Sequence, residues 1–445
     1  MPRASQSIVY KNLAGICAGI RGPGRVAKVS QVVVANGFNN LASFAISLHA
    51  ARELGPEQFG QVGLVLAIVS VGVVFLDSGV SIALVREYNT DADRERRALL
   101  VGGVLKAKLL QVILLAALAY PLAHLLRYFL PVLNNPDILT AGIVSAALLS
   151  LWTSVRSLEQ ARRDYSTFTR YIYLFGGLRF GVYGITLVLG KITPMSVILC
   201  LYLVPLALLL FYTVVLRERT ALRIHRIDLA PEARALWAAA RYGSWVAGAT
   251  LFLSLFSRVP LLVLARRSTA RELGLYSAAL TFVAGFGLIW DAISTVIVPE
   301  VSALQTAQAR LRFRALLLNK LFLMFTILAS AVGACMFAQG FLLGPAYQGS
   351  VAIFFILGSS TAVCMCISVN NNLVHAYGIP QTMTYMNLGR LILLGCVVCL
   401  WPHPNAINVA IIWGLTMLAG DTGLYLYISR RISADRASLA VAITG

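Results

Sequence analysis

Ten ionisable residues lie at mid-helix depth in the long apolar stretches of this 445-residue chain. On membrane-insertion scales, each Asp, Lys or Arg at the centre of a spanning helix costs roughly 2.5–3.5 kcal/mol. Ten such residues would not persist facing lipid, so they must face one another or water. They are Asp77, Lys106, Lys108, Arg179, Arg241, Arg258, Asp291, Lys320, Arg390 and Asp421, with a net charge of +4. We expect the functional chemistry among them.

Two Asp–Lys pairs stand out because each has the same spacing. Asp77 and Lys106 are 29 residues apart, and so are Asp291 and Lys320. Asp77 and Lys106 lie at similar depth on either side of one connection, so they can pair. One hypothesis is a structural ion pair between neighbouring helices. The other is that the carboxylates respond to a coupling cation while the lysines share a negatively charged substrate.

Three further cations, Arg179, Arg258 and Arg390, are candidates for binding an anionic substrate. A guanidinium binds two phosphate oxygens at once through its planar donors. Pro260 lies two residues after Arg258 and should bend that helix, as expected of a cavity wall. Two interpretations stay open: the arginines line a lumen, or they snorkel and pair structurally.

Polar residues follow one face of the first apolar stretch. They are Asn36, Asn39, Asn40, Ser43 and Ser47. Such a face would point into the bundle, where amides could bond sugar hydroxyls, although interhelical hydrogen bonding explains the pattern equally well. A second polar cluster, Ser368, Asn370, Asn371, Asn372 and His375, ends the tenth stretch.

Twelve apolar stretches are long enough to cross a membrane, which needs about 20 residues each. With 58% hydrophobic and only 12% charged residues, the composition is that of an all-α polytopic membrane protein. The net charge of +19 would suggest nucleic-acid binding only if a soluble domain were present. The expected spans are 29–51, 61–85, 98–126, 138–158, 168–190, 193–216, 236–264, 274–298, 314–338, 350–373, 381–401 and 406–428.

The basic residues predict the orientation of these spans. In or beside the termini and the even-numbered connections lie 24 Lys and Arg residues, against 6 in the other connections. Because basic residues are retained on the cytoplasmic side, both termini should be cytoplasmic.

An ungapped offset of 214 residues aligns the two halves of the chain. It pairs Gly60 with Gly274, Asp77 with Asp291 and Lys106 with Lys320. Six helices per half is an even number, so we expect two parallel six-helix bundles related by a pseudo-twofold axis along the membrane normal, with a cavity between them. The predicted segments are a basic cytoplasmic stretch at 1–28, a bundle at 29–216, a cytoplasmic linker at 217–235, a second bundle at 236–428 and a cytoplasmic tail at 429–445.

Motifs for enzymatic chemistry are missing from the sequence. We find no HExxH, GxSxG, Walker or dinucleotide-binding pattern and no metal-ligand spacing, so we expect no catalytic residues, no metal and no cofactor beyond a coupling proton or sodium ion. A membrane glycan polymerase typically exposes a large external loop, and the largest here is about a dozen residues.

Residues 48–87 resemble the opening helical pair of the polysaccharide flippases. The match is carried by Leu54-Gly55-Pro56, Phe59-Gly60, Asp77, Gly79 and Arg86-Glu87, and the segment FLLGPAYQGS at 341–350 is similar to a later turn of the same family. These proteins form the polysaccharide or O-antigen branch of the multidrug/oligosaccharidyl-lipid/polysaccharide (MOP) exporter superfamily.

The resemblance implies a multi-pass protein of a bacterial inner membrane. It would move an undecaprenyl-pyrophosphate-linked oligosaccharide from the cytoplasmic to the periplasmic leaflet by ion-coupled alternating access, for surface polysaccharide synthesis. The expected partners are the lipid-linked oligosaccharide, membrane lipids and polysaccharide polymerase machinery, with no nucleic acid and a monomeric chain. The alternative within the superfamily is a drug/cation antiporter, which would favour acidic cavity residues over the observed +4.

Overall fold

The computed structural model describes residues 23–90, 94–133, 135–190, 192–213, 229–302, 304, 306–377, 379, 381–402 and 404–444. Within these ranges the regular structure is helical. The helices are α2 (Pro23–Asp77), α3 (Val80–Thr90), α4 (Arg94–Phe129), α5 (Pro136–Ala161), α6 (Tyr165–Val188), α7 (Pro194–Ile198), the π-helix η1 (Leu199–Leu203), α8 (Val204–Leu210), α10 (Leu229–Arg267), α11 (Ala270–Ser302), α12 (Ala307–Leu343), the 3-10 helix η3 (Pro345–Tyr347), α13 (Gln348–Asn371), α14 (Leu373–Ala376), α15 (Gln381–Leu400) and α16 (Ala406–Thr444).

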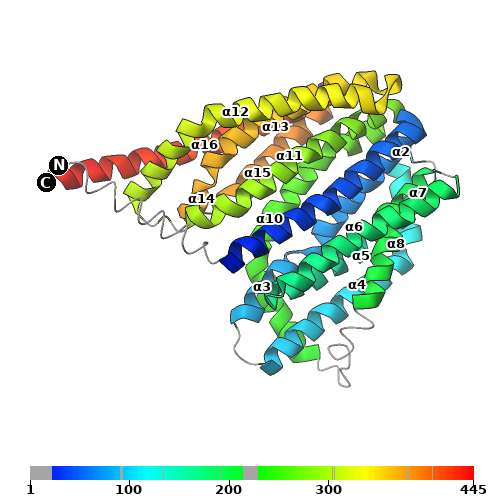
Figure 1. Ribbon diagram of the computed structural model, residues 1–445, viewed down its shortest axis with the longest axis horizontal. Helices are drawn as coiled ribbons and strands as arrows, with labels where there is room; N and C mark the ends of the chain where they lie inside the picture. Colours follow the sequence, from blue (N-terminus) through cyan, green and yellow to red (C-terminus); the bar gives the residue numbers. More distant parts are fainter. Residues whose placement is uncertain are drawn as a thin grey trace.

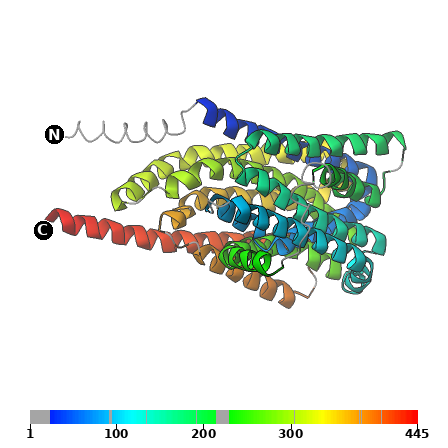
Figure 2. The same ribbon diagram turned by 90° about the horizontal axis from the view of Figure 1, so that it is seen from below.

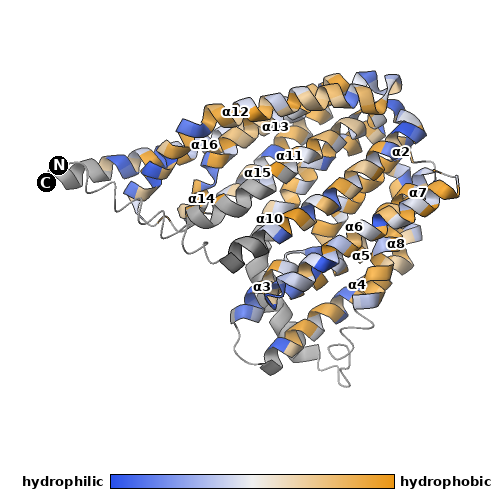
Figure 3. Cartoon of the chain, in the orientation of Figure 1, coloured by the Kyte–Doolittle hydropathy of each residue, from blue (hydrophilic) through white to orange (hydrophobic). Residues whose placement is uncertain are grey.

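These helices make twelve membrane crossings, as predicted. Nine segments of the described chain are long and apolar enough to span, and the first, Ser30–Asn89, holds two crossings joined at Gly55. α11 and α15 supply the other two. Apolar residues cover most of each helix, and hydrophilic residues gather toward the ends (Figure 3). The all-α, multi-pass prediction is confirmed.

Two glycine turns shape the first pair of crossings. Gly55 has φ 72°, a left-handed conformation that glycine adopts without steric cost, and Pro56 then starts the second crossing. That crossing ends early, because Ser78 (φ 45°) and Gly79 (φ 77°) interrupt it before α3 begins. The sequence predicted a continuous span at 61–85, whereas the structure divides it after Asp77.

Direct contacts between equivalent residues confirm the internal repeat. A Cβ at Gly60 would lie 2.7 Å from the carbonyl oxygen of Ala270, and a Cβ at Gly274 would collide with Pro56. The two contacts are equivalent under the 214-residue offset, because it pairs Pro56 with Ala270 and Gly60 with Gly274. A Cβ at Gly63 would likewise meet Ser277, its equivalent in the second half. Self-complementary contacts of this kind are those that a twofold axis generates.

We call α2 to α8 the N-bundle and α10 to α16 the C-bundle. Within each bundle the first crossing packs on the fifth: α2 packs on α6, and α10 packs on α15. α10 also packs against α3 and α4, so it lies along both bundles. Figures 1 and 2 show that α2 begins and α16 ends toward the same end of the molecule, as an even number of crossings requires.

The two bundles meet mainly at the end opposite to the termini. There α11 packs against the second crossing of α2 through the glycine contacts, and Tyr347 Oη donates a 2.7 Å hydrogen bond to the carbonyl of Ala51. Phe44 packs edge-on against Phe282 deeper in the same interface. At the other end α10 of the C-bundle packs against α3 and α4, while the other helices of the two bundles diverge in Figure 1.

Some predicted boundaries fall outside the described residues. Residues 1–22 of the basic N-terminal segment and 214–228 of the inter-bundle linker belong to this group. In the described part, α10 already begins at Leu229, and α16 continues through the predicted tail to Thr444 without a break at 428.

Candidate functional site

Arg179 is buried inside the N-bundle, with 4% of its surface exposed. Its Nη1 donates to Oδ1 of Asn39 at 3.2 Å, and its guanidinium lies over the rings of Phe175 (3.9 Å) and Tyr202 (5.0 Å). The structure therefore brings together two predicted site residues, one from the fifth crossing and one from the polar face of the first.

A proline explains the third contact of Arg179. Its Nε donates to the carbonyl of Leu201 at 2.7 Å. In a regular helix that carbonyl would accept from residue 205, but Pro205 has no N–H. The guanidinium supplies the missing donor, and the π-helical turn η1 covers the same segment.

Arg258 approaches the same aromatic residue from the other bundle. It is half-buried on α10 and lies within electrostatic range of Tyr202 of η1 and Tyr276 of α11. Tyr276 is fully buried, and its hydroxyl has no hydrogen-bond partner in the described structure. Two of the three predicted arginines thus lie in the neighbourhood of Tyr202, close to the boundary between the bundles.

Asp77 occupies the end of the second crossing, where helical carbonyls lose their partners. Oδ1 of Asp77 accepts a 2.5 Å hydrogen bond from Ser81. The buried Lys108 reaches this break from α4: its Nζ donates to the Leu76 carbonyl at 2.5 Å and to Ser150 Oγ at 2.9 Å, and it interacts electrostatically with Asp77. Lys106, the predicted partner of Asp77, is half-buried two residues away on α4.

Arg390 forms a buried ion pair with Asp421. Its Nη2 lies 2.8 Å from Oδ2 of Asp421, and both side chains are 5% exposed. Oδ1 of Asp421 accepts from Ser368 at 3.0 Å and from Asn371 at 3.3 Å. Gly420 gives the guanidinium its space, because a Cβ there would collide with the Arg390 side chain. Of the two interpretations left open for Arg390, its contacts here are those of structural pairing.

Lys320 is exposed on α12 and lines a cavity of about 980 Å³ within the C-bundle. The cavity is bounded by α11, α12, α13 and α16, and most of its lining is apolar. Lys320 is therefore placed on the outer part of the C-bundle, away from Arg179 and Tyr202 in the N-bundle.

The remaining predicted residues are more dispersed. Asn36, Asn40 and Ser43 are half-buried along α2. Asp291 is in α11, but its side chain lies outside the described residues. Among the residues that the structure describes, no group of three or more His, Cys, Asp or Glu side chains could hold a metal ion.

A hydrogen-bonded group of Arg310, Tyr377 and Asp435 joins α12 to α16 at the predicted cytoplasmic end. Asp435 Oδ2 accepts from Arg310 Nε and from Tyr377 Oη, both at 2.8 Å. Burial, followed by the hydrogen bond with Asp435, raises the pKa of Tyr377 to about 12. The hydroxyl therefore keeps its proton at neutral pH and remains a donor to the carboxylate.

Two cations have roles that the sequence did not reveal. The spacing pairs Asp77 with Lys106, yet Lys108 is the lysine that caps the end of the second crossing. Arg156 is not among the ten residues at mid-helix depth, although it is half-buried and lies 5.3 Å from the ring of Phe168. The spacing of Lys108 and Ser150, which belong to neighbouring crossings, carried no signal that they meet.

The fold and these buried charges define a polytopic membrane protein built from two pseudo-symmetric six-helix bundles. Residues 50–352 match the family described as "Polysaccharide biosynthesis protein", and the chain belongs to this family. The membership expected from the sequence motifs is confirmed. A comparison with curated proteins gives no match.

Solved structures of the MOP superfamily share the fold. An inward-facing multidrug-resistance MATE transporter is 16% identical, with a TM-score of 0.68 and coverage of 93% of this chain and 99% of that one. The lipid II flippase MurJ, in an inward closed conformation, is 13% identical with a TM-score of 0.66, covering 89% and 87%. A MOP transporter from Pyrococcus furiosus, described as having a binding pocket of reversed polarity, is 13% identical with a TM-score of 0.60, covering 92% and 96%.

Proposed function

We propose that this protein is a flippase that moves an undecaprenyl-pyrophosphate-linked oligosaccharide from the cytoplasmic to the periplasmic leaflet of a bacterial inner membrane. It would work by alternating access, supply surface polysaccharide synthesis and carry out no catalysis. Both termini would be cytoplasmic, as the distribution of Lys and Arg predicts.

The observation that carries the proposal is the position of Arg258 between the bundles. It lies within electrostatic range of tyrosines of both halves, Tyr202 and Tyr276, and the Arg179 guanidinium lies over the Tyr202 ring. Cations at this depth are costly unless they serve a partner or a substrate. A pyrophosphate suits guanidinium donors, and tyrosine faces and hydroxyls suit sugars.

The arrangement of the bundles supports cytoplasmic loading. Their tight contact through Gly60 and Gly274 lies at the predicted periplasmic end, while at the predicted cytoplasmic end the helices other than α10 diverge (Figure 1). In an alternating-access cycle this conformation would receive substrate from the cytoplasmic side.

For ion coupling we propose Asp77 as the responsive carboxylate. Its position at a helix break, bonded to Ser81 and beside Lys108, would let protonation or sodium binding alter the local charge balance. Collapse of the proton or sodium gradient should then stop flipping in vesicles, and flipping that continues without either gradient would remove this part of the proposal.

The alternative, a drug/cation antiporter, is favoured by the shared fold with MATE transporters. The side chain at the bundle boundary argues against it, because Arg258 would repel a cationic drug and attract an anionic lipid phosphate. Replacing that charge should therefore affect the two activities in opposite directions.

The test compares Arg258→Gln with Arg258→Lys in cells depleted of the native protein. We expect the lipid-linked glycan to accumulate in the cytoplasmic leaflet with the glutamine variant, flipping to fall at least tenfold, and lysine to restore part of it. The matched control is Arg52→Gln, an exposed arginine of α2. Normal delivery of glycan to the periplasmic leaflet after depletion would refute the proposed function.

A further inference from the structure

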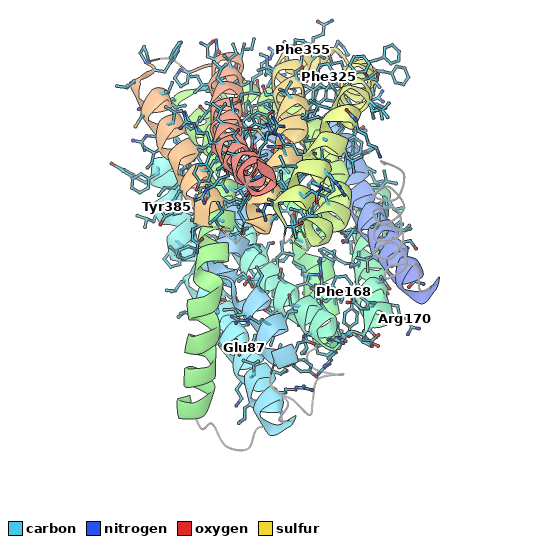
Figure 4. The ribbon with its side chains drawn as sticks, turned by 90° about the vertical axis from the view of Figure 1, so that its left-hand side faces the viewer. Glu87, Phe168, Arg170, Phe325, Phe355 and Tyr385 are labelled. Carbon is cyan, nitrogen blue, oxygen red and sulfur yellow. The ribbon has the colours of Figure 1, made fainter. Side chains whose placement is uncertain are left out.

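The cavity of about 980 Å³ in the C-bundle is a groove that opens on the outer surface of the protein. Phe322 and Phe325 of α12 line it, and they are 81% and 46% exposed. Figure 4 shows Phe325 on the outer side of the C-bundle. At membrane depth an opening of this kind faces lipid chains rather than water.

The lining changes character along the groove. Toward the middle of the membrane it is apolar, with Leu328, Val363 and Ile289, while Asn370 and Tyr425 lie toward the predicted cytoplasmic end. Lys320 lies six residues beyond the expected start of its span, about 9 Å at a helical rise of ~1.5 Å per residue. From Leu317 to Leu328 the groove follows α12 for about 16 Å.

Asn370 is the observation that points to a ligand. It is 95% buried against the groove, and among the residues that the structure describes neither Nδ2 nor Oδ1 has a hydrogen-bond partner. A buried amide without partners is unfavourable, so it calls for a group that both accepts and donates. A phosphate ester accepts, and a sugar hydroxyl or a protonated phosphate also donates.

The N-bundle fills the equivalent position with protein. Under the 214-residue offset Cys366, which lines the groove, corresponds to Trp152. Trp152 is 1% exposed and packs against Tyr171 and Phe175. The small side chain of Cys366 leaves space in the C-bundle that the indole occupies in the N-bundle.

A second cation lies beside the cytoplasmic end of the groove. Arg314, six residues before Lys320 on α12, donates through Nη2 to the hydroxyl of the lining residue Tyr425 at 3.2 Å and to Ser429 at 2.9 Å. An occupant therefore combines an anionic head near Lys320 with an apolar chain that runs toward the membrane centre. This polarity matches a lipid of the cytoplasmic leaflet.

We propose that the groove between α11, α12, α13 and α16 binds the phosphate-bearing end and first isoprene units of the polyisoprenoid carrier, with Lys320 on the phosphate and Asn370 on the adjoining polar groups. A single chain fits a groove that follows one helix, whereas a diacyl phospholipid carries two. The inference rests on the proposed function, since it gives the carrier of the same substrate a loading site outside the bundle boundary, occupied before the pyrophosphate reaches Arg258.

The experiment uses the full chain in phosphatidylcholine nanodiscs, with a photoreactive undecaprenyl phosphate as the probe. We expect crosslinks to concentrate between Leu317 and Leu328 and near Asn370. Lys320→Gln should weaken probe binding at least tenfold, and so should Cys366→Trp, which copies the N-bundle side chain. Arg312→Gln, an exposed cation of the same helix, and Cys396→Trp, an exposed cysteine of α15, are the matched controls and should bind like the wild type.

The surface variant Lys320→Gln keeps the test valid if Cys366→Trp does not fold. Three results would each overturn the inference. Crosslinks could be scattered over the protein, Lys320→Gln could bind the probe as well as Arg312→Gln does, or equimolar phosphatidylglycerol could displace the probe. Leaflet assays on the same variants separate it from the proposed function. Probe binding in the groove without any glycan transfer by the wild type refutes the flippase alone, whereas transfer with unaltered binding by both groove variants refutes the groove alone.

Discussion

At the scale of single residues, the Arg390–Asp421 pair shows how this protein holds a charge at membrane depth. The carboxylate uses both oxygens, one toward Arg390 and the other toward Ser368 and Asn371. In the described part of the chain Nε of Arg390 has no partner and the other two nitrogens bond Asn387 and the Met417 carbonyl, so the guanidinium depends on Asp421 for its counter-charge. The net contribution of such a buried pair to stability is smaller than the stability lost when one of its two residues is removed.

Asp421→Asn should therefore destabilise the C-bundle by about 3–5 kcal/mol, because it leaves the Arg390 charge buried without a counter-charge. Replacing both residues with apolar ones, Arg390→Met with Asp421→Leu, should recover most of this loss. The measurement is thermal unfolding in detergent, with the exposed Glu53→Gln as control. If Asp421→Asn were as stable as this control, Asp421 would not be the group that neutralises the buried charge of Arg390.

The sequence allowed the charged residues to be found but not paired. Hydropathy identified Arg390 and Asp421 because both interrupt apolar runs. Which faces of two helices meet depends on the rotation of each helix in the bundle, and neighbouring residues such as Lys106 and Lys108 point to different faces. Only the packed structure shows that Lys108 caps the second crossing and that Arg179 donates to the Leu201 carbonyl.

At the scale of elements, the break at Ser78–Gly79 determines where the second crossing ends. It exposes the Leu76 carbonyl to Lys108 and leaves Asp77 as the last helical residue. The Leu-Asp-Ser-Gly sequence that carried the family resemblance therefore has a physical reason: the turn needs a glycine at positive φ, and the aspartate ends the helix beside a lysine.

Gly79→Ala should cost about 1–2 kcal/mol, because an L-residue pays that amount in the left-handed region that Gly79 occupies at φ 77°. The comparison is Gly177→Ala in α6, where an added Cβ meets no atom within 4 Å and alanine favours the helix. Thermal unfolding of the two variants should thus move in opposite directions. Equal shifts would show that the turn tolerates alanine and that its geometry is not glycine-dependent.

The twelve crossings and the internal repeat could be predicted, because both can be read from the sequence pattern without knowledge of how the helices pack. A span needs only apolar length, and the offset of 214 depends on the register of charged and glycine residues. The close approach at Gly60 and Gly274 could not be predicted from one half alone, because it arises where the pseudo-twofold axis brings equivalent residues together.

At the scale of the whole molecule, this glycine contact holds the bundles together at the predicted periplasmic end. A Cβ at Gly274 would lie 2.9 Å from Cα of Pro56 and closer to its carbonyl, so any larger residue must push backbone away from backbone. The atoms in contact are backbone atoms of Pro56, Gly60, Ala270 and Gly274, so its effect on transport would come through the relative position of the bundles.

Gly274→Ala should shift the population toward conformations whose periplasmic ends are apart, and it should slow flipping several-fold. Spin labels at Glu57 and Arg271, exposed and related by the 214-residue offset, would report this separation in a background whose seven cysteines are replaced. We expect the label-to-label distance to be short in the parent protein and to gain a longer population in Gly274→Ala.

Gly287→Ala is the control. It lies on the same helix, with no described atom within 4 Å of the added Cβ, and should leave the label-to-label distance unchanged. If both alanine variants give the parent distance and the parent rate, the glycine crossing is a packing contact and the periplasmic closure must depend on other residues, such as Tyr347 and its bond to Ala51.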